Sequence, residues 1–275
     1  MLSSSLPTIS SVAIDDLRPH EEYDRQILYE IALSLQTERV VRDPIIVDAS
    51  SLMILDGTHR YWALRRMGCL SAPVAMYDYA SSSIGVSRWD RCIASPAIFL
   101  PNRKIRVEYS NEMEALAAIM DRKASLAIIG LSGSQLLVEE GFEIHRAYSL
   151  LSELETELRA KGCGISYATE EDSFLRLKKG EFSWVIVPPA IKKDEALEAA
   201  LSGRLFPIKS TRHIIPSRPI NLRIPIGWLM DPPETVNSKL QDLLSRLSFR
   251  RVRAGAILGG RRYEEEVYIG EPSNP

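Results

Sequence analysis

Cysteine is scarce in the sequence, and no metal-binding cysteine motif is present. The 275 residues include three cysteines, Cys69, Cys92 and Cys163, and no two of them form a C-x-x-C pair. This spacing indicates neither a zinc site nor a disulfide framework. The N-terminal residues MLSSSLPTISS contain no basic region followed by an apolar core, so a signal peptide is not predicted. Together these absences favour a reduced, cytoplasmic protein.

Strong net charge and long apolar runs are missing as well. The 34 basic and 36 acidic residues give a formal net charge of −2, whereas nucleic-acid-binding domains are usually strongly basic. No apolar run approaches the roughly 20 residues of a membrane-spanning helix. We therefore expect no membrane or nucleic-acid partner, although a local basic patch is compatible with the composition. Apolar residues make up 45% and charged residues 25%, as in globular proteins.

The common phosphate-binding sequences are absent too. Neither a Gly-x-x-x-x-Gly-Lys-Ser/Thr loop nor the protein-kinase signature set occurs. The stretch GLSGSQ at residues 130–135 is too weak a pattern to indicate a phosphate loop. If the chain binds a nucleotide, a part of the chain without these motifs must bind the phosphates.

Hydrophobic periodicity predicts helices and strands along the whole chain. Apolar residues at four-residue spacing predict a helix over residues 23–36. Two apolar runs, 45–47 and 52–55, are joined by small polar residues and indicate a β-hairpin. We further expect strands at 12–14, 71–79, 104–110, 124–131, 181–190 and 221–229, and helices at 59–68, 111–123, 149–162 and 192–206.

The stretch ILDGTHR, which ends at Arg60, contains more ionisable groups than a turn requires. A predicted strand ends at Asp56, and Gly57 lets the backbone approach a ligand closely. Thr58, His59 and Arg60 then open a helix, whose N-terminus favours an anion. Such a turn could hold phosphate while Asp56 contacts a divalent metal or orients a hydroxyl. The alternative is a purely structural helix start, with Asp56 or Thr58 as cap and a solvated Arg60.

The succession of strand, hairpin, DGTHR and helix resembles the ParB/sulfiredoxin superfamily over about residues 12–79. Sulfiredoxins carry a catalytic cysteine two residues before the arginine, where this chain has Thr58, and a hydroxyl cannot replace a thiolate in that chemistry. ParB proteins clamp on DNA and usually carry a basic helix-turn-helix region behind this domain. The second half of this chain has no evident region of that kind.

The free serine kinases, which phosphorylate L-serine to O-phospho-L-serine, are a closer resemblance. Four parts of the sequence carry this resemblance: LRPHEE, PIIVD with ILDGTHRYWALRRMG, SAPVAMYDY with VSRW, and SGRLFPIKSTRHIIPSRP. The last stretch has no counterpart in ParB proteins or sulfiredoxins, and the resemblance spans about residues 12–229. Two positions depart from the family pattern: its first turn histidine is Thr58 here, and its KTTRH is KSTRH, which keeps a hydroxyl at Ser210.

The resemblance implies an α+β fold with a ParB/sulfiredoxin-like N-terminal domain and a second α/β domain. Residues 1–98 would form the nucleotide-binding catalytic domain, and residues 99–275 would complete the substrate site. The implied catalytic residues are Glu21 as general base, Asp56, which is also a possible Mg²⁺ contact, and His59. The implied phosphate-binding residues are Gly57, Thr58, His59 and Arg60, and the implied substrate-binding residues are Ser34, Lys209, Ser210, Thr211, Arg212 and His213.

Several alternatives stay open at the level of sequence. Glu21 could be an exposed carboxylate without a function, and residues 209–213 could be a solvated charged run. The cofactors implied are Mg²⁺ and either ADP or ATP, and the acceptor could be L-serine or a close relative. The product would feed cysteine synthesis or another phosphoserine-consuming pathway. The competing hypotheses are a ParB-like nucleotide-dependent, DNA-associated module and a non-catalytic ligand-sensing relative. The sequence does not indicate an oligomeric state.

Overall fold

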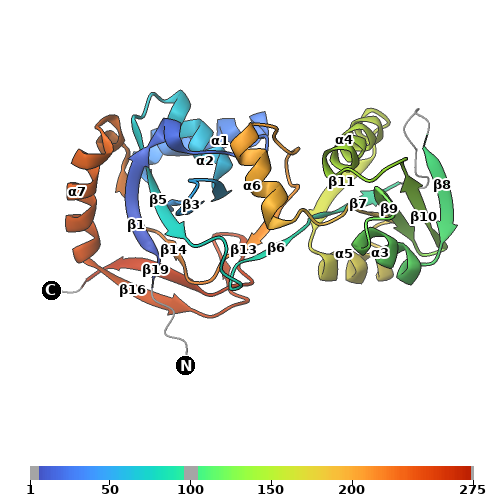
Figure 1. The fold of residues 1–275 in the computed structure, drawn as a ribbon. Helices are drawn as coiled ribbons and strands as arrows, with labels where there is room; N and C mark the ends of the chain where they lie inside the picture. The colour runs from blue at the N-terminus through green and yellow to red at the C-terminus, as the bar shows by residue number, and fades with distance from the viewer. Residues whose placement is uncertain (1–5, 96–104, 274–275) are drawn as a thin grey trace. The chain divides into compact units, whose positions relative to one another are not determined.

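The computed structural model describes residues 6–95 and 105–273, and the chain forms two compact units (Figure 1). Unit 1 comprises Met1–Gly85, Lys193–Leu205 and His213–Pro275, and unit 2 comprises Val86–Lys192 and Phe206–Arg212. This division differs from the predicted domains 1–98 and 99–275, because unit 2 is inserted into unit 1. The predicted boundary at residue 98 itself lies outside the described residues.

Unit 1 is built on a four-stranded mixed sheet. Its strands, in sheet order, are β1 (Thr8–Ala13), β5 (Ser71–Tyr77), β3 (Ile45–Asp48) and β4 (Ile54–Asp56). Strands β3 and β4 pair antiparallel, which confirms the predicted hairpin, and β3 runs parallel to β5. Helices α1 (Arg25–Glu38) and α2 (Thr58–Arg66) pack against each other. Helix α1 begins two residues later than predicted because Asp24 caps it, accepting hydrogen bonds from Gln26 and Ile27.

The core of unit 1 combines the two ends of the chain. Buried residues of the hairpin and of α2, such as Ile54 and Leu64, share one apolar cluster with Leu222, Ile224 and Leu229. Helix α7 (Pro233–Ser245) packs on β1. The N-terminal part therefore buries its hydrophobic face against C-terminal residues, which explains why unit 1 is not a contiguous segment.

The remaining elements of unit 1 are short. A three-stranded sheet has the order β14 (Arg218–Ile220), β19 (Val267–Pro272) and β16 (Leu247–Val252). The others are η1 (Ile14–Asp16), β2 (Val40–Val41), α6 (Lys193–Ser202), β15 (Ile224–Pro225), η2 (Ile226–Met230), β17 (Ile257–Leu258) and β18 (Arg261–Arg262). The predicted strand at 221–229 is wrong, since only β15 is extended there. Asn221 and Arg223 have positive φ angles, which interrupt an extended run.

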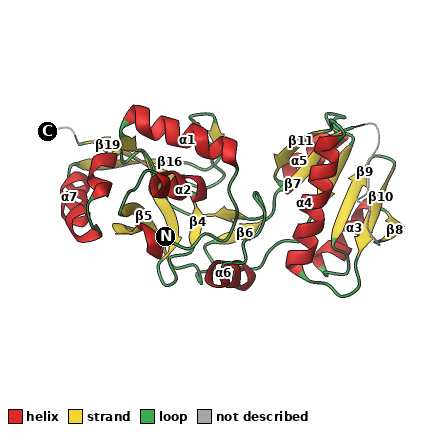
Figure 2. Ribbon diagram, turned by 90° about the horizontal axis from the view of Figure 1, so that it is seen from above, coloured by secondary structure: helices red, strands yellow, loops and turns green. Residues whose placement is uncertain are grey.

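Unit 2 is a six-stranded sheet in which every assigned strand pair is antiparallel. Its order is β11 (Gly164–Ala168), β7 (Asp90–Ala94), β12 (Trp184–Val187), β9 (Leu126–Gly130), β10 (Gly133–Val138) and β8 (Arg106–Ser110). Helix α4 (Ile144–Ala160) covers one face, and α3 (Glu112–Met120) and α5 (Glu170–Lys178) cover the other (Figures 1 and 2). Asn111 caps α3 by accepting from the backbone N–H of Glu114.

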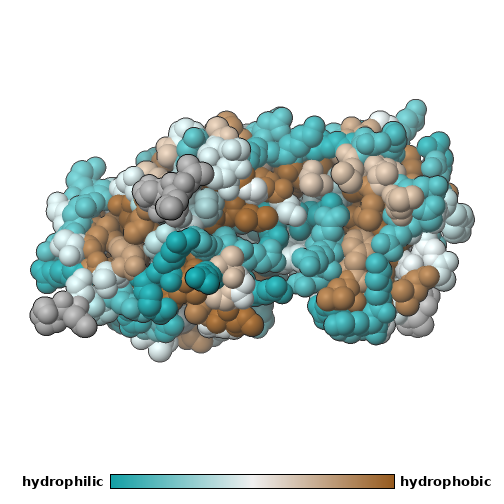
Figure 3. Space-filling view, turned by 90° about the horizontal axis from the view of Figure 1, so that it is seen from below, coloured by the Kyte–Doolittle hydropathy of each residue, from teal (hydrophilic) through white to brown (hydrophobic). Residues whose placement is uncertain are grey.

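The boundary between the units falls within β6 (Gly85–Ser87) and at β13 (Arg212–Ile214). In the described ranges, no helix has the length and apolar character needed to cross a bilayer. On the face drawn in Figure 3, hydrophobic side chains gather in several groups among hydrophilic ones.

Candidate active site

The turn after β4 has the geometry of an anion site. Gly57 adopts φ +104°, and α2 begins at the next residue. The N-cap residue of α2 is Gly57, with no side-chain cap hydrogen bond, whereas the structural alternative places Asp56 or Thr58 at the cap. The backbone N–H groups of the first turn of a helix have no intrahelical partners and attract anions.

The side chain of Arg60 folds back over this turn. Its Nη2 donates to the carbonyl oxygen of Pro44 at 3.2 Å and lies 3.5 Å from Oδ2 of Asp56. The Nε atom is buried and has no hydrogen-bond partner among the described residues. Arg60 is therefore not solvated, and it retains donor capacity beside the helix N-terminus.

Gly57 is required by both its conformation and its surroundings. A Cβ atom at this position would lie 2.8 Å from Nη2 of Arg60, in a backbone conformation that L-residues avoid. We expect Gly57→Ala to displace Arg60, to lower the free energy of unfolding by about 1–2 kcal/mol and to weaken nucleotide binding. Calorimetric titration and urea unfolding would measure the two effects. Gly68→Ala, at φ +77° with no atom within 4 Å, is the matched control, and nucleotide affinity should survive it.

Asp56 is held by a second arginine, from the C-terminal part of unit 1. Nη1 of Arg218 lies 2.6 Å from Oδ2 of Asp56, and Nε of Arg218 donates to Oε1 of Glu265 at 3.1 Å. The Arg218 side chain is 4% exposed. Burial alone would lower the pKa of Arg218, but Asp56 and Glu265 outweigh this effect and raise it. Arg218 is thus a permanently charged donor between two carboxylates.

The loop that carries Glu21 runs along β4. The backbone N–H of Arg18 donates to Leu52 O, and that of Ile54 donates to Arg18 O. His20 is buried, and its Nε2 lies 3.8 Å from Oε1 of Glu21. The Glu21 side chain is 14% exposed, so it is not the solvated carboxylate that the structural alternative describes. The hairpin strand that ends in Asp56 therefore also anchors the loop of Glu21.

Helix α2 fixes the other end of this loop. Nε2 of His59 accepts the backbone N–H of Asp24 at 3.0 Å, and Arg66 donates to the hydroxyl of Tyr23 at 2.9 Å. The Tyr23 ring also packs on Trp62 at a centroid distance of 5.1 Å. His59 therefore connects the Asp56 turn to the residues that follow Glu21. Because Nε2 of His59 accepts this hydrogen bond, it carries no proton that it could donate to a phosphate.

His20 and His213 form a buried pair of neutral imidazoles. Their rings meet edge to face at 5.3 Å, and Nε2 of His213 lies 3.0 Å from the hydroxyl of Tyr79. Burial, with the neighbouring His20, lowers the pKa of His213 to about 3, and burial also lowers the pKa of His20. At neutral pH, the imidazole of His20 beside Glu21 is therefore uncharged.

This burial predicts a pH dependence of stability. The unfolded chain protonates His213 near pH 6.5, whereas the folded protein does so only near pH 3, so stability is lost as the pH falls between these values. The loss has a slope of about 1.4 kcal/mol per pH unit for this group. We expect His213→Gln to flatten the wild-type fall in urea stability between pH 7 and pH 4. His145→Gln, at a half-buried ring stacked on Phe206, is the control, and equal slopes for all three proteins would contradict the prediction.

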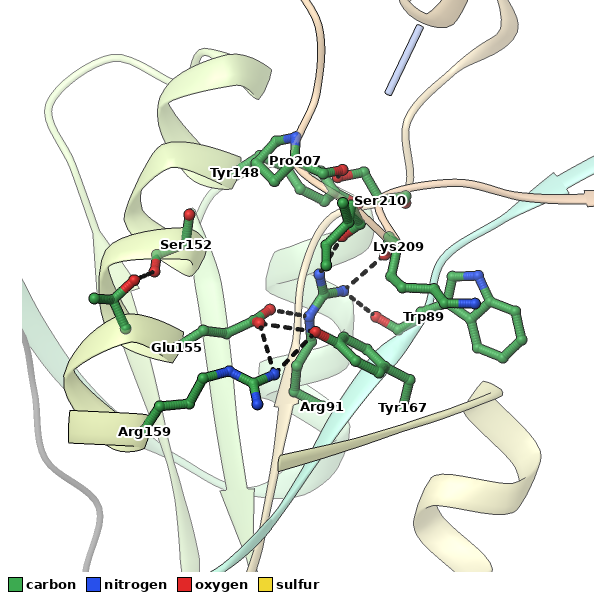
Figure 4. Close-up of polar contacts among 12 residues, drawn as sticks. Trp89, Arg91, Tyr148, Ser152, Glu155, Arg159, Tyr167, Pro207, Lys209 and Ser210 are labelled. Carbon is green, nitrogen blue, oxygen red and sulfur yellow. Dashed lines mark hydrogen bonds and ion pairs between the residues drawn. The ribbon is translucent and has the colours of Figure 1, made fainter. Parts of the chain in front are cut away.

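Unit 2 contains four of the six predicted substrate residues, Lys209 to Arg212, and unit 1 contains Ser34 and His213. Arg91 is fully buried and fixes this segment (Figure 4). Its Nη1 donates to the carbonyl oxygens of Trp89 at 2.7 Å and Lys209 at 3.1 Å, while its Nε donates to Glu155 at 2.6 Å. Hydrogen bonding to the buried Arg91 therefore fixes the backbone of this segment, which is not a solvated charged run.

The side chains of the segment differ in their surroundings. Ser210 is buried, and its hydroxyl donates to Pro207 O at 2.6 Å. Nζ of Lys209 and Cζ of Arg212 lie 5.0 and 5.6 Å from the ring centroid of Trp89, whose Nε1 donates to Thr211 O. The segment therefore presents two cations beside one aromatic ring.

Ser34 is on the exposed side of α1, and its hydroxyl donates to Glu38 at 3.0 Å. Arg218, Arg91 and Trp89 were not among the predicted site residues. Arg218 and Trp89 stand inside the stretches IIPSRP and VSRW that carry the family resemblance, which was the available signal.

Comparison with known proteins finds no matching protein-family profile. It does find curated relatives along most of the chain. The ADP-dependent L-serine kinase of Thermococcus kodakarensis is 24% identical over 225 residues, which cover 79% of this chain and 91% of the relative. An ATP-dependent L-serine kinase of Staphylococcus aureus is 23% identical over 270 residues, covering 94% and 96%. The chain is thus similar in sequence to L-serine kinases that use ADP and to ones that use ATP.

The free serine kinase fold is also present. A solved free serine kinase mutant in complex with ADP superposes with a TM-score of 0.70 at 21% identity, covering 82% of this chain and 98% of that one. A ParB-like protein of Sulfolobus acidocaldarius is 27% identical over 217 residues, covering 79% and 96%. The predicted resemblance to free serine kinases and the predicted mixed α+β fold are thus confirmed.

Proposed function

We propose that this chain is a nucleotide-dependent kinase of free L-serine that uses ADP or ATP as phosphate donor. The observation that carries the proposal is the uncapped N-terminus of α2, which begins at the turn where Asp56 and Arg60 meet. The loop of Glu21 is anchored to the adjoining strand and helix. Relationship to L-serine kinases with both donors supports the assignment.

The proposed reaction transfers the terminal phosphoryl group to the serine hydroxyl. A bond forms between serine Oγ and that phosphorus, the phosphoanhydride bond breaks, and ADP or AMP leaves. Glu21 takes the hydroxyl proton as attack proceeds, which requires a carboxylate that is ionised and within hydrogen-bond reach. The imidazole of His20, 3.8 Å from Glu21, is buried and neutral, so it adds no positive charge beside the base. Catalysis otherwise depends on positioning and charge stabilisation.

The phosphates are assigned to the turn. The backbone N–H groups at Gly57, Thr58 and His59 and the guanidinium of Arg60 are the donors, and the change from histidine to Thr58 leaves the backbone donors intact. His59 acts through its bond to Asp24, which holds the loop of Glu21. Lys209, Ser210, Thr211, Arg212 and His213 receive the substrate-binding role that the family resemblance implies. Ser34 receives none, since its hydroxyl is directed to Glu38.

Asp56 is the residue that would hold Mg²⁺. No group of three or more metal-ligating side chains occurs within residues 6–95 and 105–273, so a site made only of side chains is not indicated there. Mg²⁺ usually binds to one or two carboxylates, water and substrate phosphates, and a single aspartate beside a phosphate site fits this chemistry. When bound, the ion would neutralise charge on the transferred group.

The test is direct detection of O-phosphoserine. The protein is incubated with Mg²⁺ and L-serine, separately with ADP and ATP, and the products are measured by mass spectrometry. L-threonine and L-homoserine serve as alternative acceptors. O-phosphoserine with one nucleotide supports the proposal and identifies the donor, and absence of any phosphorylated amino acid overturns it.

The second candidate function is a ParB-like nucleotide-dependent module, which the relative from Sulfolobus acidocaldarius favours. It predicts nucleotide hydrolysis without serine and DNA binding that weakens steeply with salt. Measuring both in the same preparations separates the two functions.

A further inference from the structure

Arg218 is a buried cation whose partners join distant parts of unit 1. Asp56 lies 162 positions before it in the chain, and Glu265 lies 47 positions after it. Strand β14 starts at Arg218 and pairs in parallel with β19, and the backbone N–H of Arg218 donates to Glu266 O at 3.3 Å. This backbone pairing places Glu265, just ahead of β19, at the guanidinium of Arg218.

Two guanidinium groups approach the same oxygen of Asp56. Arg218 is at 2.6 Å and Arg60 at 3.5 Å from Oδ2. The two cations differ in mobility, because the Arg60 side chain is 20% exposed and the Arg218 side chain only 4%. A charge-assisted bond of 2.6 Å to a buried, doubly anchored arginine fixes the rotation of the carboxylate plane. Arg218 therefore sets the direction in which Asp56 can meet a hydroxyl or a metal ion.

We propose that Arg218 is a positioning residue for Asp56, and that Glu265 holds Arg218 in the required orientation. This inference rests on the proposed kinase function. Arg218 does not contact substrate in this proposal. It keeps the Asp56 carboxylate aligned during phosphoryl transfer, and the C-terminal segment that carries Glu265 becomes part of the catalytic apparatus through it.

The proposal predicts a particular kinetic pattern. Misplacement of a catalytic group by about 1 Å can cost on the order of 100-fold in rate. We expect Arg218→Lys, which keeps the charge but loses the two-pronged geometry, to lower kcat by about 10- to 100-fold. Glu265→Gln should lower kcat by about tenfold, since Arg218 loses one ionic anchor. The KM for L-serine should change little in both, because an alignment effect is expressed in the transition state.

A double-mutant cycle provides the decisive measurement. Asp56→Asn, Arg218→Lys and the double variant are compared in kcat for O-phosphoserine formation. If Arg218 acts through Asp56, the double variant is no slower than Asp56→Asn alone. Additive losses in an active enzyme would overturn the positioning role while leaving the kinase function intact. A wild-type protein that makes no O-phosphoserine would overturn the kinase function, and the positioning role with it.

Glu266→Gln is the matched control. Glu266 is adjacent to Glu265, and its side chain forms an exposed ion pair with Arg251. Its replacement should leave kcat unchanged, and a loss equal to that of Glu265→Gln would contradict the proposal. Thermal unfolding and circular dichroism establish that each variant is folded. If Arg218→Lys fails to fold, the cycle is run with Asp56→Asn and Glu265→Gln, which removes one charge and keeps the shape of the side chain.

Discussion

Glu21→Ala is expected to lower kcat for O-phosphoserine formation by about 10²- to 10⁴-fold, the usual contribution of a general base. Nucleotide affinity should persist, because the phosphate donors lie in the turn at Asp56–Arg60. The Glu21 side chain is 14% exposed, and the His20 imidazole 3.8 Å away is buried with a lowered pKa. Without the Glu21 carboxylate, the proposed acceptor of the serine proton is missing. Turnover by mass spectrometry and nucleotide binding by calorimetry measure the two properties separately.

Glu22→Ala is the matched control for this prediction. Glu22 is the next carboxylate in the chain and is exposed. Its removal should alter turnover by less than about twofold, since surface charges affect such reactions weakly. If Glu21→Ala retains wild-type turnover, Glu21 is not the base. If it also loses nucleotide binding, the variant has disturbed the loop and the turn together.

Asp56→Ala is expected to have the other large effect, on stability as well as on activity. Arg218 would remain buried with Glu265 as its acidic partner, and loss of a hydrogen-bonded partner at a buried charge costs about 1–3 kcal/mol. Asp56→Asn should cost less stability, because its amide oxygen still accepts from Arg218. Both variants should lose most turnover, because neither retains the carboxylate charge. Urea unfolding and the O-phosphoserine assay give the two quantities.

An exposed ion pair in the same unit gives the control for stability. Asp242 on α7 pairs at 2.7 Å with Arg246, the C-cap residue of that helix, and the two side chains are 62% and 73% exposed. Asp242→Ala should change the free energy of unfolding by less than about 1 kcal/mol. If Asp56→Ala and Asp242→Ala lower the free energy of unfolding equally, the contact between Arg218 and Asp56 stabilises the fold no more than an exposed ion pair does.

Local features of the site were predictable because they depend on neighbouring residues. Two apolar runs joined by small polar residues located the hairpin, and Asp-Gly before a helix-forming run located the turn at Gly57. Helix α5, by contrast, was not predicted from its local pattern. The strand predicted at 221–229 failed because positive φ angles at Asn221 and Arg223 are not encoded by hydrophobic periodicity.

Contacts between segments that are distant in the chain were predicted less well. The two predicted domains are contiguous, whereas the core of unit 1 includes residues after 213. The reason is that the apolar faces of the N-terminal strands and of α2 are complemented by Leu222, Ile224 and Leu229. Nothing in the periodicity of either segment identifies its partner.

The sequence by itself determined the elements around the Asp56 turn, the residues that form it and the family to which it is related. Only the tertiary structure decided which groups orient those residues. Arg218 reaches Asp56 across 162 positions, and His20 meets His213 although they are far apart in the chain. Such pairings depend on how buried surfaces fit together and on the satisfaction of buried charges. Both are properties of the folded chain as a whole, and short-range spacing carries no information about them.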